Sequence, residues 1–195
     1  MPPINFKANY IKSVDIQKYD GENYKPHKVA LVSLNHNDKD AVDKIAEAWD
    51  TALVHGMKES FIYPQEKLYA VTLQKKDFKT LDSNKVLGMV CFNERGEYNV
   101  GEIEYLQVHP DSISESYGKN TMTEFIKKMK RMFQKDVEPK RKAPYKHIGE
   151  CLVKSIIELY SGQPIVLISL DEAVGFYKKM GFKNSKHVMI FNPKK

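Results

Sequence analysis

Apolar residues recur along this chain at two spacings, every second residue in some stretches and every third or fourth in others. The first spacing is typical of strands, and the second is typical of helices that pack by one face. The strand-like stretches before residue 110 are residues 10–16, 28–34, 66–74, 85–93 and 99–109. The last three follow one another with turn residues such as Asn93 to Gly96 between them, so they predict an antiparallel meander.

Helical spacing fills the gap between the second and third of these strands. A helix is expected to begin at Asn37 or Asp38 and to end near Gly56. Its apolar face consists of Val42, Ile45, Ala46, Trp49 and Leu53.

A helix, a strand and a second helix are expected after Pro144. The first helix begins near Ile148, and its apolar stripe continues through Leu152, Val153, Ile156, Ile157 and Tyr160. Residues 165–168 are consecutively apolar, as in a strand that is covered on both faces. The helix from Ile148 should therefore cross between the last meander strand and this one, which predicts an α/β fold with an α+β mixed sheet.

The last helix is expected after Asp171. Gly181, followed by Phe182, predicts a glycine cap at the end of this helix, because glycine adopts the left-handed conformation without strain.

The segment between Pro110 and Pro144 predicts an inserted helix. Thr121 and Glu124 have the spacing of a capping box, and the apolar residues that follow lie on one helical face. From Lys119 to Lys146 there are ten Lys or Arg residues and three Asp or Glu residues, which leaves about −1 for the rest of a chain whose net charge is +6. The positive charge is therefore local.

Length and composition predict one globular domain. The chain has 195 residues, of which 42% are hydrophobic and 29% charged. Residues 28–195 are expected to form the domain, with a helical insertion at about 111–143, and residues 1–27 an N-terminal extension. Neither a signal peptide nor a membrane span is recognisable, so no membrane partner and a cytoplasmic location are expected. Cys91 and Cys151 are expected to be buried thiols.

Candidate chemistry begins at the start of the helix near Ile148. The first N–H groups of a helix have no partner within the helix, and the helix dipole makes this end positive. Gly149 has no Cβ, so an anion can approach the backbone there closely. Phosphate is the anion that such a helix start typically binds.

The end of the chain resembles the GNAT superfamily, the acyl-CoA-dependent N-acetyltransferases. That family ends with alanine, two residues, phenylalanine-tyrosine, three residues and glycine-phenylalanine, and this pattern is matched by Ala173, Phe176, Tyr177, Gly181 and Phe182. The resemblance covers about residues 28–192. It implies a GNAT-like fold, acetyl-CoA as the acyl donor substrate, no metal, and direct transfer to a primary amine in a ternary complex.

The family's phosphate loop is matched less closely, in two registers. In the preferred one, Ile148 and Gly149 are the closing pair and His147 replaces the middle glycine. In the other, Gly149 is the middle glycine, Cys151 the last small residue and Lys146 the leading cation. In either register the residues around the pyrophosphate are Lys146, His147, Ile148, Gly149 and Glu150.

The resemblance also implies the catalytic groups. An alkyl ammonium has a pKa of about 10.4, so a base must remove its proton before the nitrogen can attack. Glu102 is the first choice for this base and Glu104 the second, since both lie on one side of the same strand. Tyr177 corresponds to the acid that protonates the departing thiolate. The backbone wall along the acyl-CoA is expected at Leu106, Gln107 and Val108.

Several alternatives stay open. The basic stretch, with Lys140, Arg141, Lys142 and Lys146 at its end, can attract coenzyme A, form a solvated helix face, or bind nucleic acid. The acceptor can be a small-molecule amine, a protein amine or the amino group of a charged tRNA. A noncatalytic module of the same fold that binds coenzyme A or nucleic acid is the alternative to an enzyme.

Overall fold

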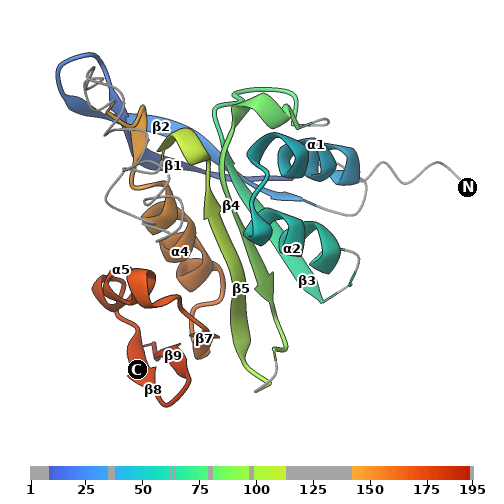
Figure 1. Cartoon of the computed structure of the whole chain (residues 1–195), viewed down its shortest axis with the longest axis vertical. Helices are drawn as coiled ribbons and strands as arrows, with labels where there is room; N and C mark the ends of the chain where they lie inside the picture. Colours follow the sequence, from blue (N-terminus) through green and yellow to red (C-terminus); the bar gives the residue numbers. More distant parts are fainter. Residues whose placement is uncertain are drawn as a thin grey trace, which may run out of the picture.

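The computed structural model describes residues 9–34, 38–61, 63, 65–78, 81–96, 99–112 and 142–193. Within these residues the fold is one mixed sheet of nine strands in the order β6-β1-β2-β3-β4-β5-β7-β9-β8. Helices lie on both of its faces (Figure 1). The expected α/β class with a mixed sheet is confirmed.

The strands have the following bounds: β1 Asn9–Tyr19, β2 Tyr24–Leu34, β3 Glu66–Thr72, β4 Val86–Asn93, β5 Gly101–Val108, β6 Tyr145–Lys146, β7 Ile165–Leu167, β8 Lys183–Ser185 and β9 Val188–Phe191. The helices are α1 Lys39–Trp49, α2 Ala52–Ser60, α4 Ile148–Leu159 and α5 Val174–Lys179. Short 3-10 turns span Ser83–Lys85, Pro110–Ser112 and Asp171–Ala173.

The order of these elements is the one expected from the sequence. Strands β3, β4 and β5 form the antiparallel meander. Helix α4 then crosses to β7, which pairs with β5 in parallel. Helix α5 and the antiparallel strands β8 and β9, which form a short hairpin, complete the fold.

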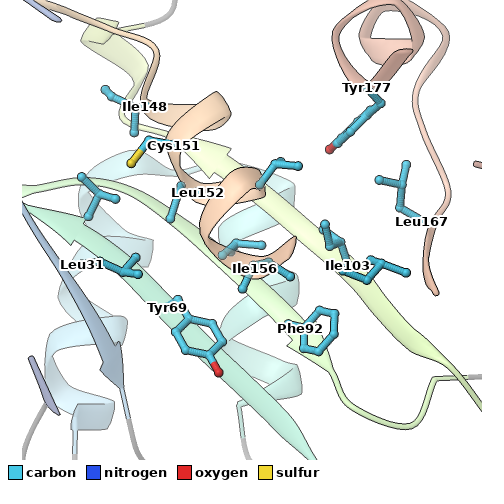
Figure 2. Close-up of a cluster of buried hydrophobic side chains, with 14 of the residues drawn as sticks. Leu31, Tyr69, Phe92, Ile103, Ile148, Cys151, Leu152, Ile156, Leu167 and Tyr177 are labelled. Carbon is cyan, nitrogen blue, oxygen red and sulfur yellow. The ribbon is translucent and has the colours of Figure 1, made fainter. Parts of the chain in front are cut away.

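The sheet separates two hydrophobic layers. On one face α4 packs its apolar stripe, including Leu152 and Ile156, against sheet residues such as Leu31 and Phe92 (Figure 2). On the other face α1 and α2 cover residues such as Val32 and Met89. Strand β4 is apolar at nearly every position because each of its faces meets a different layer.

The single helix expected from residue 38 to Gly56 is wrong, because the chain forms two. Helix α1 ends at Trp49, after which Asp50 adopts a left-handed conformation with φ 44°. The hydroxyl of Thr51 then accepts a hydrogen bond from the N–H of Val54, which caps α2. A local capping residue therefore interrupts a continuous apolar period.

The beginning of the chain belongs to the sheet. The expected edge strand at residues 10–16 is present and longer, because β1 pairs with β2 from Asn9 to Tyr19. The boundary expected at residue 27 lies inside β2, and residues 9–27 pair into the same sheet as the residues after them. The insertion expected at about 111–143, with its capping box at Thr121, lies almost entirely outside the described residues.

The glycine cap is confirmed. Gly181 follows α5 with φ 95°. Its N–H donates to the carbonyl of Lys178, and the N–H of Phe182 donates to the carbonyl of Tyr177. These two bonds form a Schellman motif, which fixes the direction in which the chain leaves α5.

None of the helices in the described part of the chain is both long enough and apolar enough to cross a membrane.

Candidate functional site

Strands β5 and β7 are paired at one end only. β7 pairs with β5 from Gly101 to Ile103, whereas β4 pairs with β5 as far as Val108. From Glu104 to Val108, the edge of β5 that faces away from β4 therefore has no strand partner among the described residues. Its backbone groups can pair with an extended ligand, as sheet edges do. Figure 1 shows α4 and α5 near this edge.

The start of α4 meets the end of this edge. A Cβ added at Gly149 would lie 3.7 Å from Cγ2 of Val108 in β5 and 3.4 Å from Cζ of Phe176 in α5. Because glycine has a hydrogen in place of this Cβ, a gap about the size of a methyl group remains where α4, β5 and α5 meet. The N–H groups of Ile148, Gly149 and Glu150 lie in the first helical turn, where an α-helix supplies no partner.

His147 precedes α4 in a left-handed conformation, with φ 64°. Glycine adopts this conformation most easily, and here a histidine occupies it. The residue that replaces the middle glycine in the preferred register thus has the backbone shape of a glycine. The backbone therefore makes a tight bend at His147, directly before the first residue of α4.

Charges of both signs surround this helix start. Oε2 of Glu150 lies 3.1 Å from Nδ1 of His147 and 4.0 Å from Nζ of Lys154. Nζ of Lys146 lies 4.0 Å from the centre of the Tyr24 ring. Lys146 therefore contributes a positive charge two residues before α4. The carboxylate of Glu150, in the first turn, interacts favourably with the helix dipole but opposes an anionic ligand.

Tyr177 lies buried in α5, with 8% of its surface exposed. Its ring packs edge-on against Phe176 and Phe182, with centroids 4.9 and 5.8 Å away. Its hydroxyl points from α5 towards the side of the molecule that holds α4 and Ile103 (Figure 2). Burial raises the pKa of Tyr177 to about 12, so the phenol keeps its proton at neutral pH.

The backbone wall expected at β5 has two faces. The side chains of Leu106 and Val108 pack into the layer on the α4 face. Gln107 is buried, and its side-chain amide donates to the carbonyl of Val108 at 2.7 Å. The side chains of these three residues therefore point to the two faces of the sheet, and what they present along the open edge of β5 is their backbone N–H and C=O groups.

Glu102 and Glu104 lie on the face opposite α4. Ile103 between them is part of the α4 layer. The register of β4 against β5 then shifts, so that Cys91 pairs with Tyr105 while Phe92 pairs with Ile103. Glu104 has no residue opposite it on β4, which is the signature of a β-bulge. Its side chain points towards α2, where Ser60 Oγ lies 3.5 Å from Oε2.

A hydrogen-bonded array that the sequence analysis missed surrounds Glu104. The side-chain amide of Asn93 donates to Oε1 of Glu66 at 2.9 Å and to Oε1 of Glu104 at 3.1 Å. The thiol of Cys91 donates to Oε2 of Glu66 at 3.3 Å. No local pattern marks Glu66, which lies at the start of β3 and is only 7% exposed. Strand pairing alone brings it to Glu104.

Burial raises the pKa of Glu66 to about 7, and the negative charges of Glu104 and Glu102 act in the same direction. Ligand atoms of Glu66, Cys91 and Glu104 lie within 4.8 Å of one another, the proximity that a metal site requires. However, burial raises the pKa of Cys91 far above its usual range, and a metal needs the thiolate. In this structure the three side chains are joined by hydrogen bonds through Asn93 and the Cys91 thiol.

A cavity of about 450 Å³ lies at the edge of the same sheet face. It is lined by Val166 and Ile190 and by Lys186 and His187 from the turn between β8 and β9. Val166 is the register partner of Glu102, so the cavity lies on the sheet face that carries Glu102, although Glu102 itself does not line it.

The chain is similar in structure to several solved acetyltransferases, at low sequence identity. No family model matches the sequence, and no curated protein matches it significantly. NAA60 of Arabidopsis thaliana, in complex with a bisubstrate analogue, is 12% identical and has a TM-score of 0.47, covering 84% of this chain and 97% of that chain. GCN5 of Tetrahymena is 15% identical with a TM-score of 0.40, covering 95% and 99%. A structure described as histone acetyltransferase HPA2 and related acetyltransferase from Corynebacterium glutamicum is 11% identical with a TM-score of 0.47, covering 86% and 97%.

Proposed function

We propose that this chain is an N-acetyltransferase that moves an acetyl group from acetyl-CoA to a primary amine. The observation that carries the proposal is the open edge of β5, which runs from Glu104 to Val108 and ends at the first turn of α4. One ligand that is extended at one end and anionic at the other fits this arrangement. Acetyl-CoA has a pantetheine arm for the strand edge and a pyrophosphate for the helix start.

In this proposal the backbone of Leu106, Gln107 and Val108 pairs with the amide groups of the pantetheine arm. The pyrophosphate lies against the N–H groups from His147 to Glu150, and Lys146 adds a positive charge. The space next to Gly149 admits the phosphate oxygens to the backbone. The thioester then lies near Glu104, where the edge of β5 becomes open.

The acceptor amine approaches from the face that carries Glu102 and Glu104. Either carboxylate can take the proton that the ammonium must lose. The cavity on this face is lined by apolar residues such as Val166 and Ile190 together with Lys186 and His187. This fits an amine group on an otherwise apolar side chain or small molecule, and a protein amine or an aminoacyl-tRNA amine presents the same chemistry.

The hydroxyl of Tyr177 assists the departure of the thiolate. A thiol has a pKa near 8.5, below the raised pKa of about 12 for Tyr177, so complete proton transfer from the phenol is unfavourable. A hydrogen bond from the phenol to the developing thiolate requires no such transfer and stabilises it. We therefore propose that Tyr177 donates a hydrogen bond to sulfur and that the proton finally comes from solvent.

Thermal unfolding with and without acetyl-CoA tests donor binding. Ligand at 100 times its Kd should stabilise the protein by about 2.7 kcal/mol, and no rise in Tm at millimolar acetyl-CoA would refute the proposal. A panel of amines followed by release of the free thiol then tests transfer. Stabilisation by acetyl-CoA without thiol release from any amine would favour the noncatalytic module. An interaction with tRNA that weakens steeply with salt would favour the tRNA acceptor.

A further inference from the structure

We propose that Glu66 is a positioning residue for the transfer reaction, which acts through Asn93 to make Glu104, and not Glu102, the proton acceptor. This inference rests on the proposed N-acetyltransferase function. It goes beyond the sequence, in which Glu66 has no motif and Glu102 is the first choice for the base.

The contacts of Asn93 carry the first step. One amide group has two hydrogens, and here one is donated to Glu66 and the other to Glu104. Glu66 is held from its other side by the thiol of Cys91. The position of Glu104 is therefore fixed by a buried partner on β3, two strands away in the sheet, whereas Glu66 itself is too deeply buried to meet a substrate.

The surroundings of the two candidate bases carry the second step. The carboxylate of Glu102 lies against the β4–β5 turn, because a Cβ added at Gly96 would clash with Oε2 of Glu102. Glu104 is the first residue of β5 beyond its pairing with β7, and it sits at the bulge. Glu104 thus lies next to the open strand edge where the thioester is proposed, on the face from which the amine approaches.

Like charges carry the third step. The titratable groups that face Glu66 are Cys91 from β4 and both Glu102 and Glu104 from β5, while α2 contributes only the hydroxyl of Ser60 to Glu104. The charges of Glu104 and Glu102 help burial to raise the pKa of Glu66 to about 7, and Asn93 links the carboxyl group of Glu66 to that of Glu104. A charge on Glu66 therefore acts directly on the proton acceptor.

The reaction then balances as follows. The ammonium gives one proton to Glu104, and the lone pair of the neutral nitrogen attacks the thioester carbonyl to form the C–N bond. The C–S bond breaks and the electron pair leaves with sulfur, which Tyr177 stabilises. The nitrogen loses a second proton as the amide forms. Both protons pass to solvent, the first by way of Glu104, which regenerates its carboxylate, and the thiolate of coenzyme A takes one proton from solvent.

The test compares pH profiles of kcat/KM for the wild type, Glu66→Gln and Glu104→Gln with the best amine from the panel. Glutamine keeps the shape of Glu66 and never becomes charged. Its one carbonyl oxygen can still accept from Asn93, and its NH2 group then faces the sulfur of Cys91, which is a weak acceptor. In Glu66→Gln the acidic limb should move to lower pH and the plateau should fall about tenfold, because a negative charge next to the proton acceptor is removed. Glu104→Gln should lower the plateau by roughly 10²-fold or more.

Two controls make the outcome decisive. Glu47→Gln removes an exposed glutamate from α1 and should leave the profile unchanged. Acetyl-CoA affinity should be the same in all four proteins, since Glu66 is on the face opposite α4. If Glu66→Gln has the turnover and the acidic limb of the wild type, the role of Glu66 is wrong while the proposed function stands. The same holds if Glu104→Gln keeps full activity and Glu102→Gln loses it. A wild type that transfers to no amine would overturn the proposed function, and this role with it.

Discussion

At the scale of single residues, burial sets the protonation states of Glu66 and Tyr177. Both are titratable groups whose neutral forms are favoured by burial, and their pKa values rise to about 7 and about 12. The first change brings a carboxyl group into the range where it exchanges a proton near neutral pH. The second keeps a phenol protonated as a hydrogen-bond donor. Residue type alone predicts neither behaviour.

The raised pKa of Glu66 makes stability depend on pH. In the unfolded chain Glu66 ionises near 4.5, whereas in the folded protein it does so near 7. The contribution of its protonated form is fully present below about 4.5 and is lost as pH rises through about 7. Glu66→Gln removes this loss, so its free energy of unfolding should exceed that of the wild type at pH 8 by roughly 1 to 3 kcal/mol. Urea unfolding at pH 4 and pH 8 measures the difference, which should nearly vanish at pH 4.

Tyr177→Phe separates packing from chemistry. Phenylalanine keeps the ring between Phe176 and Phe182, so Tm should change little. Loss of the hydroxyl should lower kcat roughly 10- to 100-fold, equivalent to about 1.4 to 2.7 kcal/mol, because the leaving thiolate loses a hydrogen bond. Acetyl-CoA affinity from calorimetry should stay near the wild-type value. Unchanged turnover would remove Tyr177 from the reaction.

At the scale of elements, the start of α4 shows what sequence can and cannot predict. The apolar period predicts the helix and its first residue, Ile148, because one face packs on the sheet. The cap at Gly181 is likewise local. By contrast, the bulge at Glu104 and the contact between Gly149 and Phe176 depend on strand register and on packing between distant segments. Only the fold shows that Glu104 adjoins the open strand edge.

The gap at Gly149 gives a prediction for this element. An alanine Cβ would be in ordinary contact with Phe176 and Val108, so Gly149→Ala should fold normally and serve as the matched control. The two branched carbons of Gly149→Val would extend beyond this Cβ, and compared with alanine, valine costs the helix less than about 1 kcal/mol in propensity. Acetyl-CoA affinity should fall about tenfold or more in the valine variant, or about 1.4 kcal/mol. Equal affinities in both variants would place the phosphates elsewhere.

At the scale of the whole molecule, the hairpin of β1 and β2 is connected to the start of α4, the candidate phosphate site. Strands β1 and β2 are joined near Gly21, and β6, which leads into α4, pairs with β1 through Gln17 and Lys18. The sequence does not predict β6, since two residues carry no period. It also places residues 9–27 in an extension, although they pair into the sheet. The hairpin therefore supports the residues that precede the helix start.

Tyr24 is the residue through which this support can be measured. Its hydroxyl donates to the carbonyl of Ala143 at 2.8 Å, and its ring lies under Nζ of Lys146. Tyr24→Phe removes the hydrogen bond alone, which is worth about 0.5 to 1.5 kcal/mol, and should lower Tm while Lys146 stays in place. Tyr24→Leu also removes the cation–π contact, worth about 0.5 to 1 kcal/mol at an exposed site, and frees Lys146. If the hairpin holds Lys146 for the phosphate, acetyl-CoA affinity should fall further in the leucine variant than in the phenylalanine variant. If it only stabilises the fold, calorimetry will give one affinity for both variants while their Tm values differ.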